Sequence, residues 1–136
     1  MKTKNLTRNL LYFVVIGISV FLLFFLITCS WIGYEVKSQC REAKREYGKD
    51  CVMSLTELLR DKNRSFRSRN SAIWALGQLG DKRVLPVLKS FYTGNVPSRE
   101  PLNKKISQYE LKKAIALAEG NLNISAIIWR IGYAEK

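Results

Sequence analysis

Hydrophobic positions divide the chain into an apolar segment and a longer part where apolar residues recur with helical spacing. Residues 10–32 contain no charged side chain. A helix of about 20 residues rises about 30 Å, the thickness of the hydrocarbon core of a bilayer. Tyr12 and Trp31 lie near the two ends, where aromatic side chains favour the membrane interface. The pattern predicts a transmembrane helix over residues 10–32, preceded by a short basic tail at residues 1–9.

Two other interpretations of the apolar segment stay open. A cleaved secretory signal has a shorter apolar core and a cleavage site between small residues. A lipoprotein signal would make Cys29 the lipidated residue, although Thr28 stands where a smaller residue normally precedes that cysteine. The length of the segment favours an uncleaved anchor over both. Basic residues flank the segment on both sides, so the positive-inside rule leaves the orientation open, and we favour a cytoplasmic N-terminus with the C-terminal domain outside.

Residues 34–134 are predicted to form an α-helical domain of repeated hairpins. Between Arg67 and Phe91, one apolar stripe leads to a glycine-rich turn and a second stripe follows it. Sliding the sequence by 29 residues superposes this segment on a first copy, in which Val36, Cys40, Ala43 and Tyr47 precede Cys51, Leu55, Leu58 and Leu59. Repeats of this kind indicate stacked helical hairpins.

A third pair of helices is more diverged. It begins near Tyr109 and ends in a stripe of four isoleucines, which we expect to face the core together with Trp129. An irregular loop at residues 93–106 precedes it, because the segment contains two prolines and few apolar residues. Trp74 lies off the main stripe and is expected to be partly exposed. The stripe residues are Ile124, Ile127, Ile128 and Ile131.

The second hairpin resembles the HEAT repeat, in the short form found in phycobilisome lyases. Its string from Ala72 to Asp81, AIWALGQLGD, is followed by VLPVL at residues 84–88. The resemblance implies an all-α fold, a short α-α solenoid of about three hairpins that binds other macromolecules. In it Gly77 and Gly80 are expected to form the helix end and turn, and Asp81 to cap the next helix. The signature residues are Arg69, Ala72, Leu76, Gly77, Gly80, Asp81, Pro86 and Leu88.

Cys40 and Cys51 are the two cysteines of the helical part, and both lie on stripes that face the seam of the first hairpin. They would form a disulfide in an oxidising compartment, with some unwinding of the helix near Tyr47, or remain two buried thiols. The disulfide agrees with an extracytoplasmic domain.

The composition excludes several kinds of chemistry. The chain has 136 residues, 23 Lys and Arg against 11 Asp and Glu, a net charge of +12 and no histidine. Without histidine there is no Ser-His or Cys-His nucleophile and no His-ligated metal. The sequence also contains no phosphate-binding loop. We therefore expect a protein that is not an enzyme and that binds no cofactor or metal.

Six basic residues are candidates for a binding surface. They could meet anionic lipid headgroups or nucleic acid, or could be ordinary solvated side chains. A membrane anchor and the lack of interleaved aromatic residues argue against nucleic acid. The candidates are Arg60, Lys62, Arg64, Arg67, Arg83 and Lys89.

The function expected from the sequence is therefore a non-catalytic interaction module. The chain would be anchored in the bilayer through residues 10–32 and would bind another protein through its helical repeats. Binding to anionic lipid or nucleic acid through a basic face is the alternative, and an activity like that of the bilin lyases is the remaining one.

Overall fold

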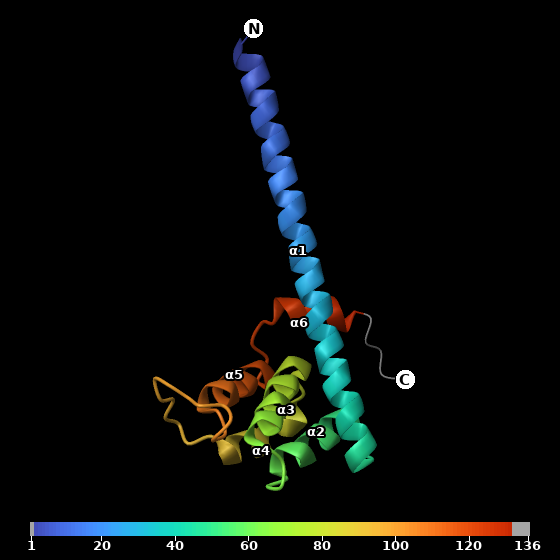
Figure 1. Ribbon diagram of the computed structural model, residues 1–136, viewed down its shortest axis with the longest axis vertical. Coiled ribbons are helices and arrows are strands. Elements are labelled where there is room, and N and C mark those ends of the chain that lie inside the picture. The colour runs from blue at the N-terminus through green and yellow to red at the C-terminus, as the bar shows by residue number, and fades with distance from the viewer. Residues whose placement is uncertain (1, 132–136) are drawn as a thin grey trace.

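The computed structural model describes residues 2–131, and the side chains of residues 7–131. The predicted all-α fold is confirmed, since the described part of the chain contains helices and no strand. One long N-terminal helix stands out from a small cluster of shorter ones (Figure 1). The elements are α1 (Lys2–Tyr47), α2 (Cys51–Arg60), α3 (Phe66–Leu79), the 3₁₀ turn η1 (Lys82–Val84), α4 (Leu85–Phe91), α5 (Gln108–Ala118) and α6 (Ile124–Arg130).

Helix α1 joins the apolar segment to the first repeat without a break. It continues through the basic tail, residues 10–32 and the first predicted stripe, and it ends at Tyr47 before Gly48, whose φ of 66° turns the chain back. The apolar side chains from Leu10 to Ile27 are largely exposed, because this half of α1 touches none of the other helices (Figure 1). By length and composition this helix could span a membrane, although a signal sequence has the same properties.

The core lies where α1, α2 and α3 meet. Val36, Cys40 and Ala43 of the predicted first stripe are buried, as are Leu55 and Leu59 of α2. Asp50 caps α2 by accepting a hydrogen bond from the backbone amide of Met53 (2.7 Å), which satisfies one of the free amides of the first turn.

Helix α3 is the centre of the domain, and it packs against both α2 and α5. Ser65 caps its start, and Gly80 ends it in a left-handed conformation with φ 63°. Gly77, which the sequence analysis placed in the turn, instead lies inside the helix. A Cβ there would come within 2.9 Å of the Ala114 Cα, so the glycine lets α3 and α5 approach closely. The turn itself is made by Gly80.

The last helix departs from a simple stack of hairpins. Helix α6 packs mainly against α1 and not against its sequence neighbour α5. Trp129 is buried, as predicted, and half-buried Trp74 also agrees with the prediction. The isoleucine stripe does not face the core as expected, because Ala126 and Trp129 take the inward side of α6. The predicted end of the domain at residue 134 lies outside the described residues.

Candidate binding surfaces

A groove of about 350 Å³ lies between α1, α3, the start of α5 and the loop that joins α4 to α5. Helix α1 contributes Glu35 and Gln39, and the Gln39 side-chain amide donates a hydrogen bond to the Glu35 carboxylate (3.0 Å). Half-buried Trp74 brings an aromatic surface to the groove. An apolar anchor with charged groups around it is typical of a binding site. The other lining residues are Arg67, Asn70, Ser71, Leu102 and Glu110.

Asn70 of α3 holds the loop that forms one wall of this groove. Its side-chain amide donates to the carbonyl oxygens of Leu102 and Lys105, both at 2.9 Å. Its side-chain oxygen accepts from the backbone amide of Ser107, also at 2.9 Å. One buried side chain thus satisfies three backbone groups of a long loop. No sequence pattern predicted this role for Asn70. It lies seven residues before Gly77 and therefore on the same face of α3.

Glu100 ties the same loop to the start of α5. Its carboxylate accepts hydrogen bonds from the Ser107 hydroxyl (2.5 Å) and from the backbone amides of Gln108 (2.7 Å) and Tyr109 (3.2 Å). Burial acts to raise the pKa of Glu100, but these hydrogen bonds and the Lys105 charge outweigh it, so its pKa lies below the ordinary value of 4.5. The ionised carboxylate therefore stabilises the loop. No sequence pattern pointed to this residue.

We predict that Glu100→Gln removes a pH-dependent part of the stability. A carboxyl whose pKa is lower in the folded state stabilises it above the unfolded pKa, and this contribution is lost as the pH falls through the folded pKa. The variant should therefore unfold at lower urea than the wild type at neutral pH, and the difference should shrink below about pH 4. Urea titrations of the full chain in detergent over this range test it. A difference that does not change with pH would contradict the role of the charge.

The HEAT-type signature residues fix the contact between the first two hairpins. Arg69 is buried, and its Nε donates to the Leu59 carbonyl at the end of α2 (2.9 Å). Its guanidinium lies 5.7 Å from the centre of the Phe66 ring and 5.9 Å from that of Phe91. The arginine thus satisfies a free carbonyl of α2 while its cation contacts two aromatic rings. Ala72, Leu76 and Leu88 are fully buried, and Pro86 lies in the first turn of α4.

Asp81 completes the pattern by accepting from the Arg83 backbone amide (2.8 Å) as the cap of η1. Residues 68–93 match the family model of the PBS lyase HEAT-like repeat. The matched HEAT-like repeat consists of α3, η1 and α4. No curated protein and no solved structure matches the chain significantly.

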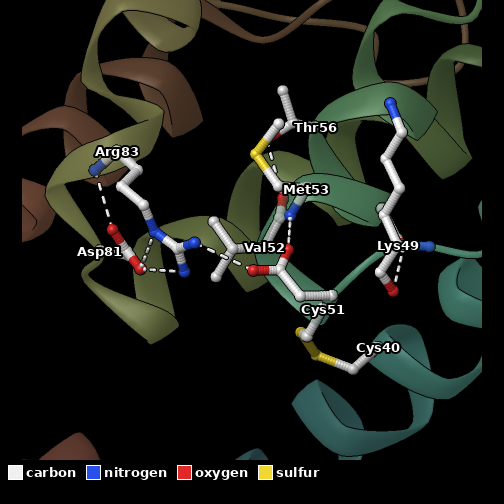
Figure 2. Close-up of a disulfide and its surroundings, with 10 residues drawn as sticks. Cys40, Lys49, Cys51, Val52, Met53, Thr56, Asp81 and Arg83 are labelled. Carbon is white, nitrogen blue, oxygen red and sulfur yellow. Dashed lines mark hydrogen bonds and ion pairs between the residues drawn. A yellow bond between two sulfur atoms is a disulfide. The ribbon is translucent and has the colours of Figure 1, made fainter.

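A disulfide joins the two helices of the first hairpin, which precedes the HEAT-like repeat. Cys40 of α1 and Cys51 of α2 are bonded, with their Cα atoms 5.0 Å apart (Figure 2). The expected unwinding near Tyr47 does not occur, since α1 stays helical to that residue. Gly48 turns the chain with φ 66°, and residues 48–50 then bring Cys51 back beside Cys40.

Arg83 links this junction to the HEAT-like repeat. Its guanidinium bonds to Asp81 in its own turn (2.8 Å), as Figure 2 shows. It also bonds to Asp50 at the start of α2 (2.9 Å). The hydrogen bond from Arg83 lowers the pKa of Asp81 below its ordinary value, against the opposing effect of burial. The start of α2 is therefore held by the disulfide on one side and by this arginine on the other.

We predict that replacing Cys40 and Cys51 together by serine lowers the free energy of unfolding by about 2–3 kcal/mol, because the unfolded chain loses a cross-link. Thermal denaturation of the full chain in detergent measures the loss. A reductant should lower the melting temperature of the wild type and leave that of the double variant unchanged. If the reductant affects both proteins equally, the bond does not stabilise the fold.

Four of the six basic candidates pair with carboxylates. Lys62 is exposed, and Arg67 lines the groove. The structure thus brings Arg67 to the groove and pairs four of the others with carboxylates. The remaining four form the ion pairs Arg60–Glu57 (3.9 Å), Arg64 with Glu46 and Asp61, Arg83 with Asp50 and Asp81, and Lys89–Glu119 (2.7 Å).

Within the described side chains, no group of three or more His, Cys, Asp or Glu residues is placed to hold a metal ion. The expectation that the protein is not an enzyme and binds no cofactor stays a prediction.

Proposed function

We propose that the chain is a single-pass membrane protein whose helical-repeat domain binds another protein through the groove between α1, α3 and the 92–107 loop. The groove is the observation that carries this proposal. It combines one aromatic side chain, Trp74, with carboxylates from α1 and α5 and with Arg67. Tryptophan and arginine are the residues that most often dominate the energy of protein interfaces.

The position of the groove favours a partner that is itself close to the membrane. Glu35 lies three residues beyond the predicted end of the span at Ile32, on the same continuous helix. A segment bound beside Glu35 and Gln39 is therefore held within about two helical turns of the bilayer surface. A membrane-proximal segment of another membrane protein fits this place.

The ion pairs favour protein binding over the basic-surface alternatives. Four of the six basic candidates face carboxylates, and such pairs reduce the potential that would attract phosphates of lipid or nucleic acid. The groove contains charges of both signs, which suits a peptide with its own mixed charges better than a polyanion.

We further propose that the domain faces an oxidising compartment, outside the cytoplasm. The disulfide between Cys40 and Cys51 supports this orientation, because such bonds persist where thiols are not kept reduced. Thiol labelling in intact, unreduced cells, with a denaturing quench, tests it. We expect neither cysteine to label until a reductant is added. Full labelling without reductant would place the domain in the cytoplasm.

A photo-crosslinking experiment tests the binding surface. A photoreactive residue replaces Leu102 on the groove wall, or Met53 on α2 as a control position outside the groove, in the full-length protein in its native membrane. We expect a discrete crosslinked product from position 102 and none from position 53. Trp74→Ala should remove that product by weakening binding at least about 30-fold, and Trp74→Phe should retain most of it.

The same experiment can overturn the proposal. Equal products from positions 102 and 53, or a product that survives Trp74→Ala in a protein with unchanged helicity, would show that the groove is not the binding site.

A further inference from the structure

Helix α6 lies across α1 at the end of the apolar span. A Cβ added to Gly33 of α1 would come within 2.8 Å of the Trp129 Cβ, so the two helices touch at this glycine. Cys29, one turn earlier on the same face of α1, is also buried. This face of α1 is therefore shielded from solvent as far as the last turn of the apolar segment. Figure 1 shows α6 crossing α1 where the long helix leaves the domain.

The polar side of α6 is fixed to the domain. The Asn123 side-chain amide donates to the Gln78 side chain (3.0 Å), and the Arg130 guanidinium donates to the Gln78 carbonyl at the end of α3. Arg130 also lies 5.6 Å from the centre of the Trp129 ring. Burial lowers the pKa of Arg130. These bonds set the rotation of α6 about its own axis.

With that rotation, the isoleucine stripe points away from the rest of the domain. Residues at positions 124, 127 and 131 lie together on one helical face, roughly opposite the buried side chains of Ala126 and Trp129. Their exposed fractions are 57% for Ile124, 55% for Ile127 and 83% for Ile131. Leu122, just before the helix, is 76% exposed. A contiguous apolar face of this kind is typical of a surface that contacts another protein or a membrane.

We propose that this isoleucine face of α6 lies in the bilayer interface, so that α6 is a second, monotopic membrane contact of the domain. The proposal rests on the proposed membrane anchoring. The occupant is lipid because α6 meets α1 at Gly33, at the end of the apolar span and beside the level of Trp31, which is 71% exposed on α1. Helix α6 carries one charged residue, Arg130, whose guanidinium turns to the Gln78 carbonyl at the end of α3. A helix that lies flat with apolar residues on one side and polar groups on the other is the form that inserts into a membrane interface.

Lipid quenching in reconstituted vesicles tests this contact. The full-length protein carries Cys29→Ala and one new cysteine, labelled with an environment-sensitive fluorophore, in phosphatidylcholine vesicles with or without brominated lipid. The test position is Ile127→Cys. The matched control is Ser90→Cys, an exposed residue on α4, a helix of the same length at the far end of the domain (Figure 1). Leu22→Cys reports insertion of the span.

We expect brominated lipid to quench the fluorophore at position 127 at least twofold, nearly as strongly as at position 22, with little effect at position 90. Quenching at position 22 alone would overturn the contact by α6 and leave the membrane anchor standing. No quenching at positions 22 or 127 would overturn both. Self-quenching at position 127 that rises with the protein-to-lipid ratio, without quenching by lipid, would show that a second copy of the chain covers the face, and this too would overturn the proposal.

Discussion

Leu76→Asp is expected to unfold the helical-repeat domain or to lower its free energy of unfolding by more than about 4 kcal/mol. Leu76 lies fully buried in α3, the helix that packs against both α2 and α5. An aspartate there would place a charge in the core without a partner. A loss of this size approaches the whole stability of a small domain. Thermal denaturation of the full chain in detergent, followed by circular dichroism, measures it.

Leu102→Asp is the matched control for this substitution. Leu102 is half exposed on the loop, so the same change there should alter the melting temperature little. An unchanged melting temperature for Leu76→Asp would show that α3 does not form the centre of the core.

Asn70→Ala is expected to lower the free energy of unfolding by about 2–4 kcal/mol, because three backbone groups of the 92–107 loop lose their partner. The carbonyls of Leu102 and Lys105 and the amide of Ser107 all bond to this one side chain. Since the loop forms a wall of the groove, the variant should also lose the crosslink from position 102. Urea unfolding and hydrogen exchange of the loop amides provide the measurements.

The control for Asn70→Ala is Asn103→Ala, the same substitution at an exposed position of the same loop. It should change stability by less than about 0.5 kcal/mol. If the two variants behave alike, Asn70 does not organise the loop.

Local patterns were sufficient to predict most of the helices. The stripes of the first two hairpins, the irregular segment before Tyr109 and the turn glycine Gly80 were all predicted, because each depends on residues near one another in the sequence. The pairing of Cys40 with Cys51 was predicted as one of two alternatives, since both stripes faced the same seam.

Features set by distant contacts could not be predicted. Periodicity places four isoleucines on one face of α6, but it does not say whether that face turns inward. The answer depends on Gly33, about 100 positions earlier, which accommodates Trp129 and so turns the isoleucines outward. Gly77 was assigned to a turn for a similar reason. The residue that it contacts, Ala114, belongs to another repeat and cannot be identified from the residues around Gly77.

The residues of the candidate site were harder to predict from the sequence than the helices were. Of the six basic candidates, Arg67 lines the groove, and the structure adds Glu35, Gln39 and Glu110 from α1 and α5. Glu100 acts on the groove wall through a loop without periodicity, so no local pattern marks it. Grooves between helices depend on packing angles, which a single sequence does not specify.

In a chain anchored in the bilayer as proposed, the continuity of α1 fixes the direction in which the groove faces within the plane of the membrane. Trp31 and Thr28 lie one and two turns before Glu35 on the same side of α1, and no flexible linker intervenes between them. The helical-repeat domain therefore cannot rotate relative to the apolar half of α1, as it could if a disordered linker joined them. Under the proposed anchoring, a membrane-spanning partner that fills the groove would bring its own span alongside the Thr28 and Trp31 side of α1, so its lateral direction of approach would be set before the two proteins touch.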